Sequence, residues 1–95
     1  MTENNKLYTF LLEYKGGTYI SQIEADSNKS ALMKWSESLN VSEIEGIGEK
    51  MKEQIKNAAK LETPSLLQGM NNVWCATFLL AGNLALVNFV KTETD

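Results

Sequence analysis

Histidine and arginine are both absent from the 95 residues of this sequence, and each absence narrows its possible chemistry. Histidine is the usual general base near neutral pH and the commonest zinc ligand, so acid–base catalysis and zinc binding are disfavoured. The planar guanidinium group of arginine forms paired hydrogen bonds with guanine edges and with phosphates, and it is therefore common in nucleic-acid-binding proteins. Because lysine supplies all nine cationic side chains and the net charge is −3, general nucleic-acid binding is disfavoured as well.

Cysteine and long apolar runs are also scarce. Cys75 is the only cysteine, so no internal disulfide can form, and because no base is in position to activate its thiol we expect a buried structural residue. The longest apolar stretch, residues 76–90, is interrupted by polar residues and glycine and is shorter than the roughly 18 residues of a membrane span. The polar first residues do not resemble a secretion signal. We therefore expect a cytoplasmic protein with no membrane contact.

The sequence does contain enough apolar material for one core. Hydrophobic residues make up 43% of the chain, which excludes disorder caused by a shortage of apolar side chains. A chain of this length typically forms one domain. We predict a single domain over residues 1–95, with residues 1–6 and 93–95 as flexible ends.

Alternating apolar residues predict a β-hairpin in the first quarter of the chain. Strands over residues 7–15 and 18–25 flank Gly16-Gly17, which suits a two-residue turn that needs positive φ. This turn places Tyr14 opposite Tyr19. One face of the hairpin then forms part of the core and carries Tyr8, Phe10, Leu12, Tyr14, Tyr19 and Ile23.

Helical periodicity follows in the middle of the chain. A helix is predicted over residues 28–39, capped by Asp26 or Ser27, with Trp35 packing across the aromatic face of the hairpin. A second helix is predicted over residues 49–61. It ends before a Thr-Pro-Ser sequence, because proline disfavours helical geometry in the residue before it.

A second hairpin is predicted over residues 73–80 and 84–92, around Gly82-Asn83. Both of its faces are largely apolar, unlike those of a sheet with one face in water. Either these are the central strands, or the helices cover one face and another chain covers the other. The candidate interface residues on that second face are Val73, Cys75, Leu79, Leu86 and Val90.

Together these elements predict an α+β fold in the order ββααββ. The two hairpins form a four-stranded antiparallel sheet, and the two helices pack on one of its faces.

The segment before the second helix contains Gly46-Ile47-Gly48, followed by Lys50 and Lys52. It resembles the hairpin of helix-hairpin-helix DNA-binding modules, in which a Gly-apolar-Gly turn opens the second helix. The resemblance implies that Gly46, Gly48, Lys50 and Lys52 contact a nucleic-acid phosphate at the helix N-terminus. The alternative interpretation is a simple connection in which the glycines set the angle at which the chain enters the helix.

No catalytic, metal-binding or cofactor-binding constellation is present in the sequence, so we expect neither an enzyme nor a bound cofactor. The prediction is a small interaction or regulatory module that self-associates, as a homodimer, through residues 73–92, with another protein as the alternative partner. Two further alternatives stay open. One is nucleic-acid binding through the Gly46-Ile47-Gly48 turn, and the other is binding of a small apolar ligand on the aromatic sheet face, where Trp74, Phe78 and Phe89 lie.

Overall fold

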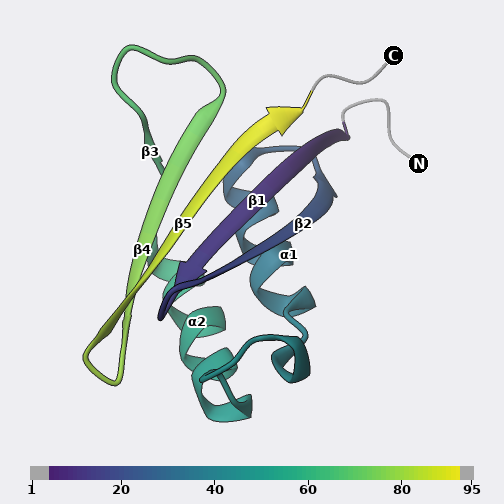
Figure 1. The fold of residues 1–95 in the computed structure, drawn as a ribbon. Helices are drawn as coiled ribbons and strands as arrows, with labels where there is room; N and C mark the ends of the chain where they lie inside the picture. The colour runs from purple at the N-terminus through teal and green to yellow at the C-terminus, as the bar shows by residue number, and fades with distance from the viewer. Residues whose placement is uncertain (1–4, 93–95) are drawn as a thin grey trace.

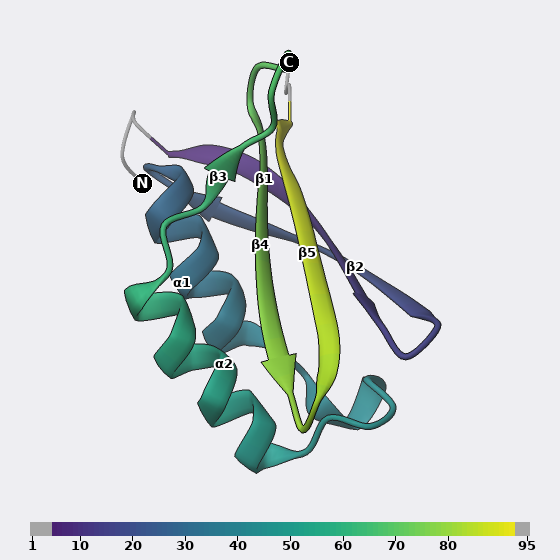
Figure 2. The same cartoon turned by 90° about the vertical axis from the view of Figure 1, so that its left-hand side faces the viewer.

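Two α-helices pack against one face of an antiparallel sheet (Figures 1 and 2). The computed structural model describes residues 5–92. The strands are β1 (Lys6–Tyr14), β2 (Gly17–Ala25), β3 (Ser65–Leu66), β4 (Val73–Leu80) and β5 (Asn83–Thr92). The helices are α1 (Asn28–Ser38) and α2 (Glu49–Leu61), with a 3-10 turn, η1 (Val41–Glu43), between them. The strand order across the sheet is β2-β1-β5-β4-β3, so the first and last long strands are neighbours.

The α+β class and the antiparallel sheet are confirmed, but the predicted four strands and the order ββααββ are wrong. The sheet has five strands, because Ser65 pairs with Cys75 and Leu66 pairs with Trp74 to form β3. Strand β3 gives no signal in the sequence, because two residues are too few to show an alternating pattern.

The hairpin registers also differ from those predicted. In the first hairpin the turn residues are Lys15 and Gly16, with φ of 48° and 81°, and Tyr14 pairs with Gly17 instead of Tyr19. In the second hairpin the turn residues are Ala81 and Gly82, with φ of 52° and 80°. Positive φ at both central residues is the type I′ pattern, and glycine takes its second position. Each register therefore moves by two residues, which leaves every side chain on its predicted face.

Both helices form close to their predicted bounds. The Ser27 hydroxyl caps α1 by accepting a hydrogen bond of 3.1 Å from the backbone amide of Ser30. The inward stripe of α1 is buried, including Leu32 and Trp35. In α2 the inward positions Ile55 and Ala59 are fully buried. Local signals for caps and periodicity were sufficient here because they need no knowledge of the tertiary fold.

A column of stacked aromatic rings joins α1 to the sheet. Phe10 lies between Trp35 and Phe89, with ring centroids 5.5 Å and 4.4 Å away. Trp74 extends the column from β4, at 5.6 Å from Phe89. The predicted packing of Trp35 on the first hairpin is confirmed. Helices α1 and α2 both lie on this side of the sheet, and neither covers the other side (Figure 2).

The ends of the described chain lie side by side, since Leu7 of β1 pairs with Thr92 of β5. The predicted flexible ends, residues 1–6 and 93–95, fall largely outside the described residues, although Lys6 already belongs to β1. Within residues 5–92, neither helix has the length and apolar character needed to cross a bilayer.

Candidate interaction surface

Within residues 5–92, one face of the sheet carries neither α1 nor α2. We call it the open face. Its residues alternate along each strand with the buried ones, and their pairing places them in rows across the four long strands. The open face consists of Leu7, Thr9, Leu11, Glu13, Thr18, Ile20, Gln22, Glu24, Val73, Cys75, Thr77, Leu79, Leu84, Leu86, Asn88, Val90 and Thr92.

The half of the open face formed by β4 and β5 bears no charged side chain. Leu79 and Leu84, which pair across the hairpin, are 74% and 56% exposed. The remaining apolar residues on this half are half-buried. All of the interface candidates predicted from the sequence lie here, namely Val73, Cys75, Leu79, Leu86 and Val90.

Strands β1 and β2 continue the apolar surface, and no local pattern in the sequence predicts this continuity. Leu11 pairs with both Ile20 and Asn88, so one row runs from the β2 edge to Cys75 on β4. Ile20 is 66% exposed. The missing information was the pairing of β1 with β5, because it joins segments about 80 residues apart and leaves no local signal.

Most polar groups on the open face lie at its margin, and Thr9 and Asn88 lie at interior positions. The Thr9 hydroxyl bonds that of Thr92 at 2.5 Å and accepts from the Gln22 amide at 3.0 Å, which ties three strands together. Asn88 lies in the central strand between Leu11 and Cys75. Any partner that covers this point must satisfy the Asn88 amide, since an unpaired buried polar group costs about 1–3 kcal/mol.

The thiol of Cys75 is half-buried in this face. Burial raises its pKa, and the nearby Glu62 carboxylate raises the pKa further. A reactive cysteine needs the opposite shift, since the thiolate is the nucleophile. At neutral pH Cys75 therefore behaves as a small apolar side chain within the surface.

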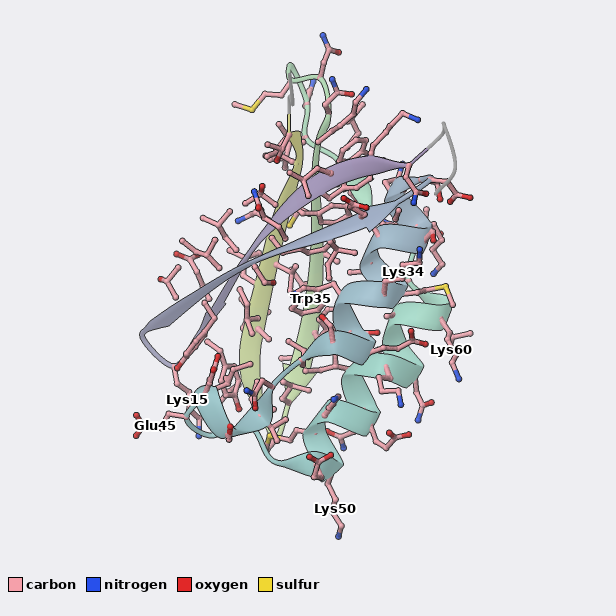
Figure 3. The ribbon with its side chains drawn as sticks, turned by 90° about the vertical axis from the view of Figure 1, so that its right-hand side faces the viewer. Lys15, Lys34, Trp35, Glu45, Lys50 and Lys60 are labelled. Atoms are coloured by element: carbon pink, nitrogen blue, oxygen red, sulfur yellow. The ribbon has the colours of Figure 1, made fainter. Side chains whose placement is uncertain are left out.

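The residues of the helix-hairpin-helix resemblance lie at the opposite end of the molecule from the β3 strand. Gly46 has a φ of 88°, and a Cβ there would lie 3.3 Å from the Tyr14 ring and 3.4 Å from Lys15 Cδ, so the loop packs closely on the first hairpin. Gly48 is the N-cap of α2. Figure 3 shows Lys50 pointing away from the fold at this end, and Lys52 is half-buried.

The segment that would supply the first helix of such a module is only the three-residue η1 turn. Ile44 and Ile47 on either side of Gly46 are buried in the core. Glu49 occupies the first turn of α2 and Glu45 precedes the glycines, so carboxylates flank the proposed phosphate position. The loop geometry is that of an anchored connection between helices.

The aromatic residues of the ligand-binding alternative are part of the core. Phe89 has no exposed surface, Phe78 is 6% exposed, and Trp74 is half-buried against Tyr8 and Phe89. These rings stack on one another beneath the helices. Their apolar surface is therefore already used within the chain.

Comparisons of this chain with protein-family models, with curated proteins and with solved structures give no significant match.

Proposed function

We propose that this protein is a small non-enzymatic interaction module that self-associates through its open face. The observation that supports this most directly is an apolar sheet face with no helix over it, on which the β4–β5 half is free of charge. Contiguous exposed apolar surface of this kind marks interaction sites. The raised pKa of the Cys75 thiol is in keeping with a binding role for that residue rather than a chemical one.

The size of the face favours a second copy of the chain as its partner. Strands about 4.8 Å apart with a rise of about 3.3 Å per residue give a face of roughly 19 by 26 Å, or about 500 Å². With side-chain relief, two such faces bury roughly 1,000–1,300 Å² in total, at the lower end of the ~1,200–2,000 Å² typical of specific interfaces. Interfaces of this small size occur in weak and transient complexes, so we expect a reversible dimer and take a dissociation constant on the order of 1–100 µM as the range to test.

The expected dimer stacks two sheets with their helices outside. Face-to-face sheets pack about 10 Å apart with strand directions within about 30° of each other. The uncharged β4–β5 half supplies the apolar centre of the contact. Glu24 lies near the end of the edge strand β2, where it stays at the rim in water, whereas Glu13 pairs with Leu86 and borders the apolar centre.

The test is sedimentation equilibrium of the wild type and two charge-insertion variants. Leu79→Lys places an ammonium group in the open face, and because Leu79 is already exposed the fold tolerates the change. Leu61→Lys is the matched control, since Leu61 is 88% exposed at the end of α2, away from the open face. We expect Leu79→Lys to weaken dimerisation at least about tenfold, equivalent to ~1.4 kcal/mol, and Leu61→Lys to leave it unchanged.

A wild-type protein that stays monomeric at several hundred micromolar would overturn the proposal. Equal weakening by both variants would place the contact elsewhere than on the open face.

A further inference from the structure

Strand β2 forms an open edge of the sheet along its whole length of nine residues. It contains neither lysine nor proline, the residues with which proteins usually protect an edge from pairing with another chain. Thr18, Ile20, Gln22 and Glu24 are all exposed. The edge therefore presents a strand-shaped set of backbone groups to the solvent.

The hairpin register fixes which backbone groups point outward. Tyr14 and Gly17 flank a two-residue turn, so they form a hydrogen-bonded pair, and bonded and non-bonded pairs alternate from there along the strands. Ile20 pairs with Leu11 in a non-bonded position. The amide and carbonyl groups of Thr18, Ile20 and Gln22 consequently point away from β1.

One of the outward carbonyl groups already accepts a hydrogen bond, which supports the direction assigned to the backbone groups of β2. The Lys34 ammonium group of α1 donates to the Glu24 carbonyl oxygen at 3.4 Å, at the far end of β2 from the turn (Figure 3). Within residues 5–92, no hydrogen bond reaches the outward amides or carbonyls of Thr18, Ile20 and Gln22. These three residues therefore offer a short ladder for one additional strand.

A cavity of about 140 Å³ lies beside this ladder, between β2 and the C-terminal end of α1. Its apolar wall includes Tyr19, Trp35, Leu39 and Ile44. An apolar cavity of ~150 Å³ accommodates benzene, so this one fits one leucine-sized side chain. In an added strand, the side chains opposite Tyr19 or Ser21 face the helices and thus enter the cavity.

The cavity rim sets the preferred charge of the occupant. Glu43 lines the cavity and forms no salt bridge within the described part of the chain. A lysine or arginine two residues from the inserted side chain projects on the same side of the strand and meets this carboxylate.

The geometry points to β2 and the adjoining cavity as a docking site for an extended peptide of a partner protein, with a leucine-like anchor and a basic residue two positions away. Backbone hydrogen bonds to Thr18, Ile20 and Gln22 supply the pairing, and the cavity supplies the selectivity. This site uses the outward backbone groups of β2 and a cavity on the helix side, and it shares only the side chains of Thr18, Ile20 and Gln22 with the open face.

The probe is a fluorescently labelled octapeptide with blocked ends that repeats leucine, threonine, lysine and threonine. Anisotropy titration measures its binding, and amide chemical shifts locate it. Ile20→Pro removes an outward amide without breaking a bond to β1, whereas Ile20→Ala trims the side chain and keeps the amide. We expect Ile20→Pro to weaken binding at least about tenfold and Ile20→Ala to change it less than about threefold.

A second peptide, with glutamate in place of lysine, tests the charge preference. We expect it to bind at least about threefold more weakly, and Glu43→Lys to reverse the order of the two peptides. Absence of binding by the wild type at millimolar peptide, or equal binding by Ile20→Pro, overturns the proposal. Shifts of the Thr18 and Gln22 amides with protein concentration in Leu79→Lys, whose open-face dimer is weakened, also overturn it, because they would assign the edge to a second copy of this chain.

Discussion

The ammonium group of Lys29 joins the start of α1 to the end of α2. Lys29 lies in the first turn of α1, and its Nζ donates to the Ala59 carbonyl at 2.5 Å, to the Lys60 carbonyl at 3.0 Å and to the Glu62 carbonyl. An ammonium has three donors, so all of them are used. These acceptors are among the carbonyls left without partners at the end of α2, where the helix dipole also favours a cation.

Replacing Lys29 therefore weakens the contact between the two helices. We expect Lys29→Met, which keeps an apolar stem, to lower the free energy of unfolding by about 1–2 kcal/mol. Lys56→Met is the control, because Lys56 forms only a surface salt bridge of 3.2 Å with Glu53, and its loss costs less than about 0.5 kcal/mol. Urea unfolding at one low protein concentration measures both. Equal effects of the two variants would contradict the assigned role of Lys29.

At the scale of elements, the helices and the two hairpins were predictable, but the hairpin registers and the pairing between the hairpins were not. The Ser27 cap and the buried stripe with Trp35 are signals contained within about a dozen residues. Strand faces were also predictable, since alternation has a period of two. Register was not, because a shift of two residues leaves each face unchanged, and the order β2-β1-β5-β4-β3 depends on contacts between distant segments.

The same distinction holds for the candidate sites: residues of one hairpin could be placed from the sequence, and contacts between the two hairpins could not. Residues Val73 and Val90 could be placed on one apolar face from their own hairpin. The share of the open face formed by Leu7 and Leu11 could not, because it depends on the pairing of β1 with β5. The proposed docking edge could not be predicted from the sequence either, because a strand is recognised as an edge only when the order of the whole sheet is known.

The turn of the second hairpin makes a prediction at this scale. Ala81 has a φ of 52°, a left-handed conformation that costs a residue with a Cβ roughly 1 kcal/mol and that asparagine tolerates better. We expect Ala81→Asn to raise the free energy of unfolding by about 0.5–1 kcal/mol, because Asn-Gly is the preferred type I′ pair. Thermal and urea unfolding give the change.

Gly82→Ala is the matched variant for that turn. Gly82 has a φ of 80° and open space where a Cβ would lie, so any loss of stability comes from the backbone alone. We expect a loss of about 1 kcal/mol. Destabilisation by Ala81→Asn would show that the turn does not adopt the type I′ conformation.

For the whole molecule, the fold separates two kinds of surface. The helices and the aromatic column close one side of the sheet, and the two proposals use the open face and the β2 edge that remain uncovered within residues 5–92. The first has apolar area without directional backbone bonds, which suits a second identical face. The second has backbone donors and acceptors beside a small cavity, which suits an extended segment. The two surfaces meet at β2, where the side chains of Thr18, Ile20 and Gln22 belong to the open face and their backbone groups form the edge.

The reactivity of the Cys75 thiol can test the proposed dimer without any change to the sequence. Its thiol lies in the open face, and burial, followed by the Glu62 carboxylate, raises its pKa, so alkylation proceeds through a small thiolate fraction that grows as the pH rises. At a fixed pH, we expect the iodoacetamide labelling rate per molecule to fall several-fold between ~5 and ~500 µM protein, since the dimer covers the thiol. Leu79→Lys should remove this dependence and Leu61→Lys should retain it. A rate independent of concentration in a protein that sedimentation shows to be dimeric would mean that the copies meet through another surface, and the β2 edge would then be the one to examine.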